Sequence, residues 1–231
     1  MIQRDFVIRT IQQLAHTLAA LLGGAKGRHL AETMERLDVI SATFTGMDLP
    51  TLRSFSYRDL RALFSASGEL AVERAFAAAR VLHVEAELAS ERGAGFSREQ
   101  ALTALRLLAE ATEALGGFTD DDHAEAFTSL HAALRGELPG EALEQVFGAA
   151  RTAGRFDLAE DVLFEWVRLD TEKRAQGAAE SFYLELLGLP DDALERGRLP
   201  RDEVLEGMRE LGMEPPAATR PASREPGGGM K

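Results

Sequence analysis

An acidic run followed by two histidines is the first feature of the sequence that could bind a ligand. Asp122 and His123 end the run from Asp120 to His123, and His131 follows two helical turns later, close to the same helix face. Carboxylates and imidazoles together bind divalent cations, so Asp122, His123 and His131 are candidate metal ligands. The alternative is an ordinary helix start, in which the carboxylates favour the positive end of the helix dipole and His123 packs on Phe118.

A second pair with chemical potential is His83 and Glu87, which stand one helical turn apart. An imidazole and a carboxylate at this spacing can act together in acid–base catalysis, or hold a metal with help from elsewhere. His83 also shares an apolar stripe with Phe76, Ala79 and Ala86, which favours a histidine packed in the core or at its edge. Catalysis needs a further positioned group that the sequence does not identify, so no catalytic residue is assigned.

Aromatic side chains in the C-terminal part of the chain are the candidates for direct contact with another protein. Aromatic residues are enriched at binding hot spots, which makes Trp166, Phe182 and Tyr183 candidates. The alternative for Trp166 is core packing, because it falls on the inward side of an apolar helical stripe. For Phe182 and Tyr183 both roles stay open, because a last helical repeat is either capped or bound by a partner.

The composition excludes several other kinds of chemistry. The 231-residue chain has no cysteine, which excludes disulfides, thiolate nucleophiles and thiolate metal sites. Its formal net charge of -12 opposes broad contact with nucleic-acid phosphates or anionic lipid, so neither nucleic acid nor membrane is expected as a partner. No glycine pair follows a strand or precedes the Gly-Lys-Ser/Thr that cradles a nucleotide. No cofactor is expected.

The protein is expected to lie in the cytoplasm. Its first residues show no basic run followed by an uninterrupted apolar core, and no later stretch reaches the roughly 20 apolar residues of a membrane span. The lack of cysteine fits a reducing compartment.

Helices must position these side chains, because apolar residues recur at helical spacing along the chain. The first helix is expected to end at Gly23-Gly24, and a second to cover Leu30 to Phe44. The short connector between them implies an antiparallel pair. Further helical patterns run from Val72 to Ala86 and from Leu105 to Leu115. No segment alternates with a period of two, so no sheet is expected.

Two kinds of local sequence mark where helices begin. In one, a Phe precedes a Ser or Thr, and an acidic or amide residue follows the hydroxyl after three positions. This is the pattern of a capping box with a hydrophobic staple, and it occurs at Phe55-Ser56, Phe96-Ser97 and Phe118-Thr119. The other is a Leu-Pro pair, ending at Pro139, Pro190 and Pro200, which suits a first helical turn.

The domain organisation predicted from these patterns is one all-helical domain over residues 1–212, with a candidate subdivision near 136–140. Residues 213–231 are rich in Pro and Gly. Such a composition cannot bury enough apolar surface to offset the entropy lost on ordering, so a flexible tail is predicted.

The segment from Gly140 to Thr171 resembles a tetratricopeptide (TPR) unit. Leu143, Val146 and Ala150 match the packing residues of the first helix of such a unit. Gly154 matches its turn glycine, and Phe156 and Ala159 match the aromatic and the small residue of its second helix. Phe147, Trp166 and Thr171 depart from the motif, which implies looser or differently angled packing. The opening from Arg4 to Leu14 is similar to the start of an uncharacterised bacterial family of helical, TPR-like proteins. This resemblance implies a helical fold in a bacterial cytoplasm, and no activity or site residue.

The fold predicted from the sequence is all-α, with helical hairpins stacked as a TPR-like α-solenoid or a compact helical array. Such arrays present surface to other proteins, so the first functional hypothesis is a non-enzymatic protein-interaction or scaffold module. The alternative is a small-molecule or metal-binding protein, or a cryptic hydrolase, with a pocket between helices near His83, His123 and His131. The expected partner is another protein or a second copy, the latter as a homodimer.

Overall fold

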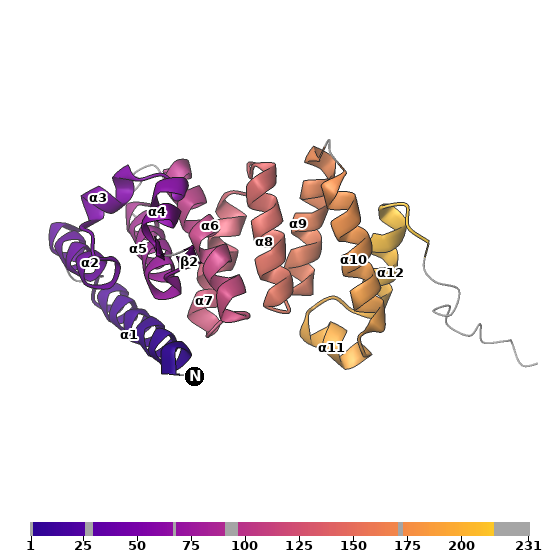
Figure 1. Cartoon of the computed structure of the whole chain (residues 1–231), viewed down its shortest axis with the longest axis horizontal. Coiled ribbons are helices and arrows are strands. Elements are labelled where there is room, and N and C mark those ends of the chain that lie inside the picture. The colour runs from indigo at the N-terminus through magenta and orange to yellow at the C-terminus, as the bar shows by residue number, and fades with distance from the viewer. Residues whose placement is uncertain (1, 26–29, 67, 91–96, 171–172, 215–231) are drawn as a thin grey trace, which may run out of the picture. The chain divides into compact units, whose positions relative to one another are not determined.

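The computed structural model describes residues 2–25, 30–66, 68–90, 97–170 and 173–214. Contacts divide the chain into two compact units, Met1–Asp170 and Thr171–Lys231. The described residues form twelve helices and one two-stranded sheet, so the predicted all-α class is confirmed (Figure 1). None of the helices in these ranges combines the length and the apolar character that a membrane span needs.

The first unit is built from nine helices in its described residues. They are α1 (Ile2–Ala25), α2 (Leu30–Thr45), α3 (Leu49–Ser54), α4 (Tyr57–Leu63), α5 (Val72–Ser90), α6 (Arg98–Leu115), α7 (Asp121–Ala133), α8 (Gly140–Thr152) and α9 (Phe156–Leu169).

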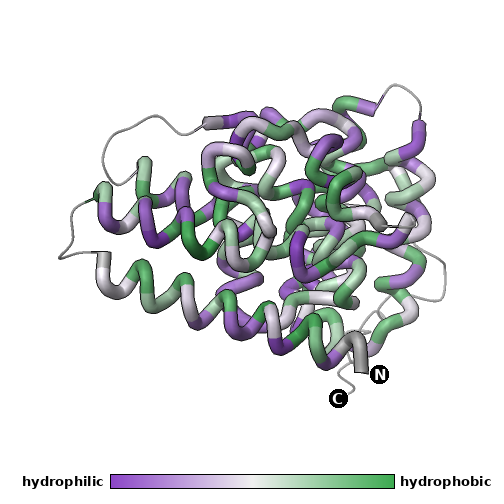
Figure 2. The backbone as a smooth tube through the Cα atoms, turned by 60° about the vertical axis from the view of Figure 1, so that its left-hand side comes forward, coloured by the Kyte–Doolittle hydropathy of each residue, from purple (hydrophilic) through white to green (hydrophobic). Residues whose placement is uncertain are grey.

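Helix α5 is the centre of the first unit. It packs against α1, α2, α6 and α7, while α6 in turn packs against α4, α7 and α8. The run from Ala75 to Ala79 is buried on every side of the helix, with no residue more than 1% exposed. Small side chains allow this because neighbouring helices can approach closely around alanine. Hydrophobic positions recur along the helices in alternation with hydrophilic ones, as the amphipathic pattern predicts (Figure 2).

Most predicted helix starts are confirmed. Ser56 caps α4 with a complete capping box, in which its hydroxyl accepts from the Asp59 N–H and the Asp59 carboxylate accepts from the Ser56 N–H. Ser97 caps α6 by accepting from the Gln100 N–H. The third start was predicted at Thr119 and lies one residue later. Its N-cap is Asp120, whose carboxylate accepts from the His123 N–H at 2.8 Å.

The three proline signals also mark helix starts. Pro139, Pro190 and Pro200 each occupy the N-cap position in extended conformation, and the helix begins at the next residue. Phe96, predicted as a staple residue before Ser97, lies outside the described residues.

Two expectations about the N-terminal half are wrong. Helix α1 continues through Gly23 and Gly24 to Ala25, because glycine lowers helix stability without forcing a stop. A sheet also exists, although none was expected. Strands β1 (Ser65–Ala66) and β2 (Glu69–Leu70) pair antiparallel between α4 and α5. Strands of two residues are too short to show an alternating pattern in the sequence.

Helices α8 and α9 form the hairpin that the sequence predicts between Gly140 and Thr171. The turn uses Gly154 at φ +69°, a left-handed conformation that side chains rarely adopt. Helix α8 also packs against α6, so contacts continue across the segment 136–140. Leu138 in that segment is buried, which ties it to the first unit. The boundary between units lies at Asp170 and Thr171 instead.

The second unit contains α10 (Arg174–Gly188), α11 (Asp191–Arg196) and α12 (Arg201–Glu210) in its described residues. Helix α10 packs against α12. Arg201 reinforces this contact, because its guanidinium donates to the carbonyl oxygens of Leu187 in the last turn of α10 and of Leu189 just after that helix. Of the predicted flexible tail, residues 215–231 lie outside the described residues.

Candidate functional site

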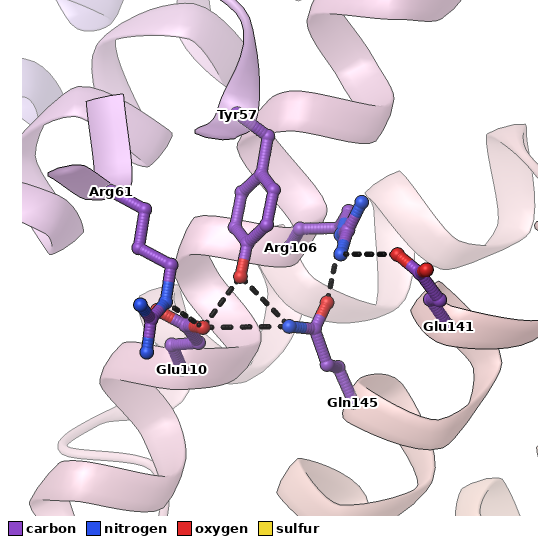
Figure 3. Close-up of polar contacts among 6 residues, drawn as sticks. All are labelled: Tyr57, Arg61, Arg106, Glu110, Glu141 and Gln145. Carbon is purple, nitrogen blue, oxygen red and sulfur yellow. Dashed lines mark hydrogen bonds and ion pairs between the residues drawn. The ribbon is translucent and has the colours of Figure 1, made fainter. Parts of the chain in front are cut away.

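A polar network joins three helices of the first unit (Figure 3). The Tyr57 hydroxyl of α4 donates to the Glu110 carboxylate of α6 and accepts from Gln145 Nε2 of α8 at 2.7 Å. The Arg106 guanidinium of α6 lies 3.8 Å from the centre of the Tyr57 ring and donates to Gln145 Oε1 at 2.8 Å. A cation over an aromatic face is attracted by the ring quadrupole, so the stacking holds Arg106 in place.

The outer members of the network are also paired. Arg61 Nε lies 2.8 Å from Glu110 Oε1, and Arg106 Nη2 lies 3.5 Å from Glu141 Oε2. Burial is the main cause that raises the pKa of Tyr57, and its hydrogen bond to Glu110 adds to this. The phenol therefore keeps its proton at neutral pH. Together, these hydrogen bonds and ion pairs position α4 against α6 and α8.

Beside this network, α3, α4 and the first turns of α6 enclose two adjoining cavities, which we call the polar cleft. Their volumes are about 260 Å³ and about 210 Å³. Both are lined by Ser56, Glu99 and Thr103. The larger cavity adds Leu52, Arg53, Ser54, Phe55, Asp59, Leu82, Ser97 and Gln100, and the smaller adds Tyr57, Arg58, Leu102 and Arg106.

Several polar groups around the cleft are already engaged. Ser56 and Asp59 complete the cap of α4, and Arg53 forms an ion pair with Glu85 of α5. Burial raises the pKa of Glu85, although Arg53 opposes this effect. These side chains are held by their partners, so the cleft walls are fixed in advance of any ligand.

Thr103 differs from several other helical threonines of the first unit in how its hydroxyl is used. The hydroxyls of Thr10, Thr17, Thr43, Thr112 and Thr128 each donate to the backbone carbonyl four residues earlier. For the Thr103 hydroxyl no hydrogen-bond partner is found among the described residues, although the residue is only 5% exposed. Thr103 lines both cavities, so its free hydroxyl is available to a group inside the cleft.

Two charged side chains of the smaller cavity are also free of ion pairs with the described residues. Arg58 follows the start of α4, and Glu99 lies in the first turn of α6. Both are exposed. The cleft thus offers a cation, an anion and a hydroxyl between rigid walls.

His123 is enclosed by a chain of hydrogen bonds. The Thr119 N–H lies 3.2 Å from Nδ1, and Nε2 lies 2.9 Å from the Thr112 hydroxyl, which donates to the Leu108 carbonyl. This arrangement assigns the imidazole proton to Nε2. Burial lowers the pKa of His123 to about 4, so the ring is neutral. Phe76 and Phe118 pack edge-on against it, as the helix-start hypothesis proposes for Phe118.

The other predicted metal ligands do not join His123. Asp122 is exposed at the start of α7, and His131 is buried two turns further along that helix. The pKa of His131 is lowered by burial, and Glu165 and Asp161 of α9 oppose this. Within the described part of the chain, no three His, Asp or Glu side chains are placed to share a metal ion.

His83 and Glu87 do approach each other, with 3.5 Å between His83 Nε2 and Glu87 Oε1. On the other side of the ring, Arg80 Nη1 lies 3.3 Å from His83 Nδ1. Burial, with help from the Arg80 charge, lowers the pKa of His83 to about 4. His83 is 4% exposed and lies in the core, whereas Glu87 is exposed, so the pair lies at the edge of the core.

The three aromatic candidates are also core residues. Trp166 is 3% exposed and packs against Phe147, with 6.0 Å between ring centres. Phe182 and Tyr183 are fully buried and contact each other edge-on. A side chain that touches a partner must reach the surface, so we assign these three aromatics to packing.

Most residues of the polar cleft carry no signal in the sequence that marks them as a site. The one related signal is the Phe55-Ser56 helix start, which places Ser56 at the N-cap of α4. Thr103, Arg58 and Glu99 look in the sequence like ordinary polar positions of solvated helix faces.

Comparisons with known proteins place the chain in a family without assigning it an activity. Neither a curated protein nor a solved structure matches the chain. A family model matches residues 1–214, and the chain therefore belongs to DUF6483, a family of unknown function.

Proposed function

We propose that this protein is a non-enzymatic protein-interaction module whose polar cleft binds an extended, polar segment of a partner protein. The observation that carries the proposal is Thr103, a nine-tenths buried threonine whose hydroxyl has no partner among the described residues and lines both cavities. The residue is largely buried but its hydroxyl is open to the cavities that it lines. A peptide group in the cleft could therefore form a hydrogen bond with it without displacing a protein partner.

The charged side chains of the smaller cavity indicate which partner segment would fit the polar cleft. Arg58 and Glu99 line the smaller cavity without ion pairs to described residues. A segment with an acidic residue near Arg58 and a basic residue near Glu99 would satisfy both. Such rim charges contribute mainly to orientation and selectivity, while the rigid walls limit the entropy lost on binding.

The proposal includes a TPR-like arrangement of hairpins as the scaffold. It is supported by the α8–α9 hairpin, by the left-handed turn glycine Gly154 and by the buried small residue Ala159. Helices α5 and α6 also pack against each other, and α6 packs against α8. Stacked helices of this kind hold loops and helix ends in fixed positions, which is what a binding cleft requires.

At the three-helix network and at His123, an interaction role is favoured over catalysis because the polar groups already have protein partners, whereas the buried Nε2 atoms of His83 and His131 have no hydrogen-bond partner among the described residues. Tyr57, Arg106 and Glu110 are bound to one another, and His123 has a partner at each ring nitrogen. A general base must reach the proton that it removes, and these groups are turned toward protein partners.

A displayed library of random peptides, selected on the full chain, tests this function. We expect the selected peptides to carry an acidic and a basic residue and to lose at least about tenfold in affinity for Thr103→Val, which keeps the shape of the side chain and removes its hydroxyl. Arg58→Glu should weaken the same peptides, and a peptide with the acidic residue changed to Lys should bind Arg58→Glu better than the unchanged chain.

Thr128→Val is the matched control. Its hydroxyl donates to the Ala124 carbonyl outside the cleft, so peptide affinity should stay the same. Failure to select any peptide, or equal affinity for the unchanged chain and both cleft variants, would overturn the proposal.

A further inference from the structure

A second surface of the first unit is apolar and lies between α1 and α2, away from the residues of the polar cleft. A groove of about 630 Å³ is lined by Thr17, Ala20 and Leu21 of α1 and by Glu32, Glu35, Arg36, Val39 and Ile40 of α2. Val39 is 65% exposed at this groove. In Figure 2, α1 is the helix that runs to the N-terminal label, with hydrophobic positions recurring along it.

Helical spacing extends this surface beyond the groove. Phe6, Thr10, Thr17 and Ala20 fall on one side of α1, and Val39 and Thr43 fall on one side of α2. Phe6 is 62% exposed. An exposed apolar surface of this kind on a soluble domain commonly marks an interaction site.

The threonines on this surface do not make it polar. The Thr10, Thr17 and Thr43 hydroxyls donate to the backbone carbonyls of Phe6, Gln13 and Val39, each one turn earlier in its own helix. The donor of each hydroxyl is therefore used within the helix, and a partner meets largely the methyl groups.

The charges at the groove indicate the kind of partner. Arg36 is paired with Glu32 one turn earlier, with 2.9 Å between the charged atoms. Glu35 has no ion pair with the described residues, which leaves a net negative charge beside the apolar surface. The whole chain carries a formal charge of -12. Two copies would therefore repel each other, whereas a basic partner would be attracted.

We propose that the α1–α2 groove binds an amphipathic helix of a partner protein, with apolar side chains facing Val39 and Ala20 and with Lys or Arg beside Glu35. A helix fits because two adjacent helices leave a groove into which the side chains of a third can pack. This site is independent of the polar cleft and uses different residues.

A fluorescently labelled amphipathic peptide of about 18 residues, or five helical turns, is the probe. One version has leucines along one face flanked by lysines, and its counterpart has the same leucines flanked by glutamates. Fluorescence anisotropy with the full chain should show tighter binding of the lysine version. Val39→Ser should weaken it about tenfold, the effect of losing one buried valine side chain, and Glu35→Lys should weaken it as well.

Matched variants separate the groove from general attraction to an acidic protein. Glu203→Lys on α12 makes the same change in net charge at an exposed position, and Leu184→Ser on α10 removes another exposed apolar side chain. Neither should change the affinity.

Three results would overturn the proposal. These are equal binding of the two peptides, no loss of affinity in Val39→Ser, or a loss in Glu203→Lys as large as in Glu35→Lys. Sedimentation analysis tests whether a second copy of the chain occupies the groove. A dimer that dissociates in Val39→Ser would assign the groove to that second copy and would also overturn the proposal.

Discussion

At the scale of single residues, burial decides what the histidines of this chain do. His123 has the residue type of a metal ligand or a catalytic base, but both ring nitrogens face partners within the first unit. A buried, neutral imidazole with satisfied nitrogens rigidifies the core around it. This burial destabilises the protein only when the pH falls, because the buried imidazole of the folded protein does not readily take up a proton.

The pH dependence of stability tests this role. The pKa of His123 is about 4 in the folded protein, against 6.5 for a free histidine, so the unfolded chain takes up the proton first on acidification. The free energy of unfolding should be fully retained above about pH 6.5 and should fall by on the order of 3 kcal/mol from this residue as the pH drops to about 4.

Urea unfolding followed across this pH range measures the effect. His123→Gln should be less stable near pH 7, because it loses the matched hydrogen bonds, and should show a shallower decline with acid. Part of the loss of stability with acid should remain in this variant, because the pKa of His83 is also lowered to about 4. An unchanged slope in the variant would show that His123 does not carry this effect.

At the scale of elements, local sequence signals fix where helices start and turn. Ser56 and Ser97 satisfy backbone N–H groups that the helix leaves unpaired, and such caps act within a few residues. Asp120, and not Thr119, caps α7. Either side chain can accept a hydrogen bond from a backbone N–H of the first turn, and the Asp120 carboxylate accepts from the His123 N–H.

The turn between α8 and α9 gives a prediction at this scale. Gly154 has φ +69°, where a side chain is strained even though nothing lies within 4 Å of the added atom. Gly154→Ala should lower the free energy of unfolding by about 1 kcal/mol. Gly23→Ala is the control, because Gly23 lies in α1 without positive φ or nearby atoms, and it should be neutral or stabilising by up to about 1 kcal/mol. Thermal unfolding of both variants by circular dichroism makes the comparison.

At the scale of the whole molecule, the contacts separate Met1–Asp170 from Thr171–Lys231. The first unit contains the buried centre at α5, the three-helix network and both proposed binding surfaces. An element set with its own core should fold without the rest of the chain.

A chain that ends at Asp170 tests this independence. It should unfold cooperatively in urea, with coincident midpoints from far-ultraviolet circular dichroism and from the fluorescence of Trp166, the single tryptophan. Trp166 is buried, so its emission should be that of a shielded indole in the folded chain. Emission of a fully exposed indole without denaturant would show that residues 171–231 are needed.

The helical class, most helix starts and the α8–α9 hairpin follow from local patterns in the sequence. These depend on apolar spacing and on caps, which act between residues close in the chain. For Trp166 the stripe of its own helix favoured the inward side over contact with a partner, and the side chain is buried in the structure.

Which polar residues share a site depends on how the helices pack in three dimensions. Arg58 on α4 and Thr103 on α6 meet at one cavity although they are far apart in the sequence. The Thr112 hydroxyl bonds to its own backbone and the Thr103 hydroxyl has no partner among the described residues, a difference that the sequence does not show. For Phe182 and Tyr183 the sequence allows either a surface or a core position. The structure buries both, because burial is a property of the packed chain and not of one helix.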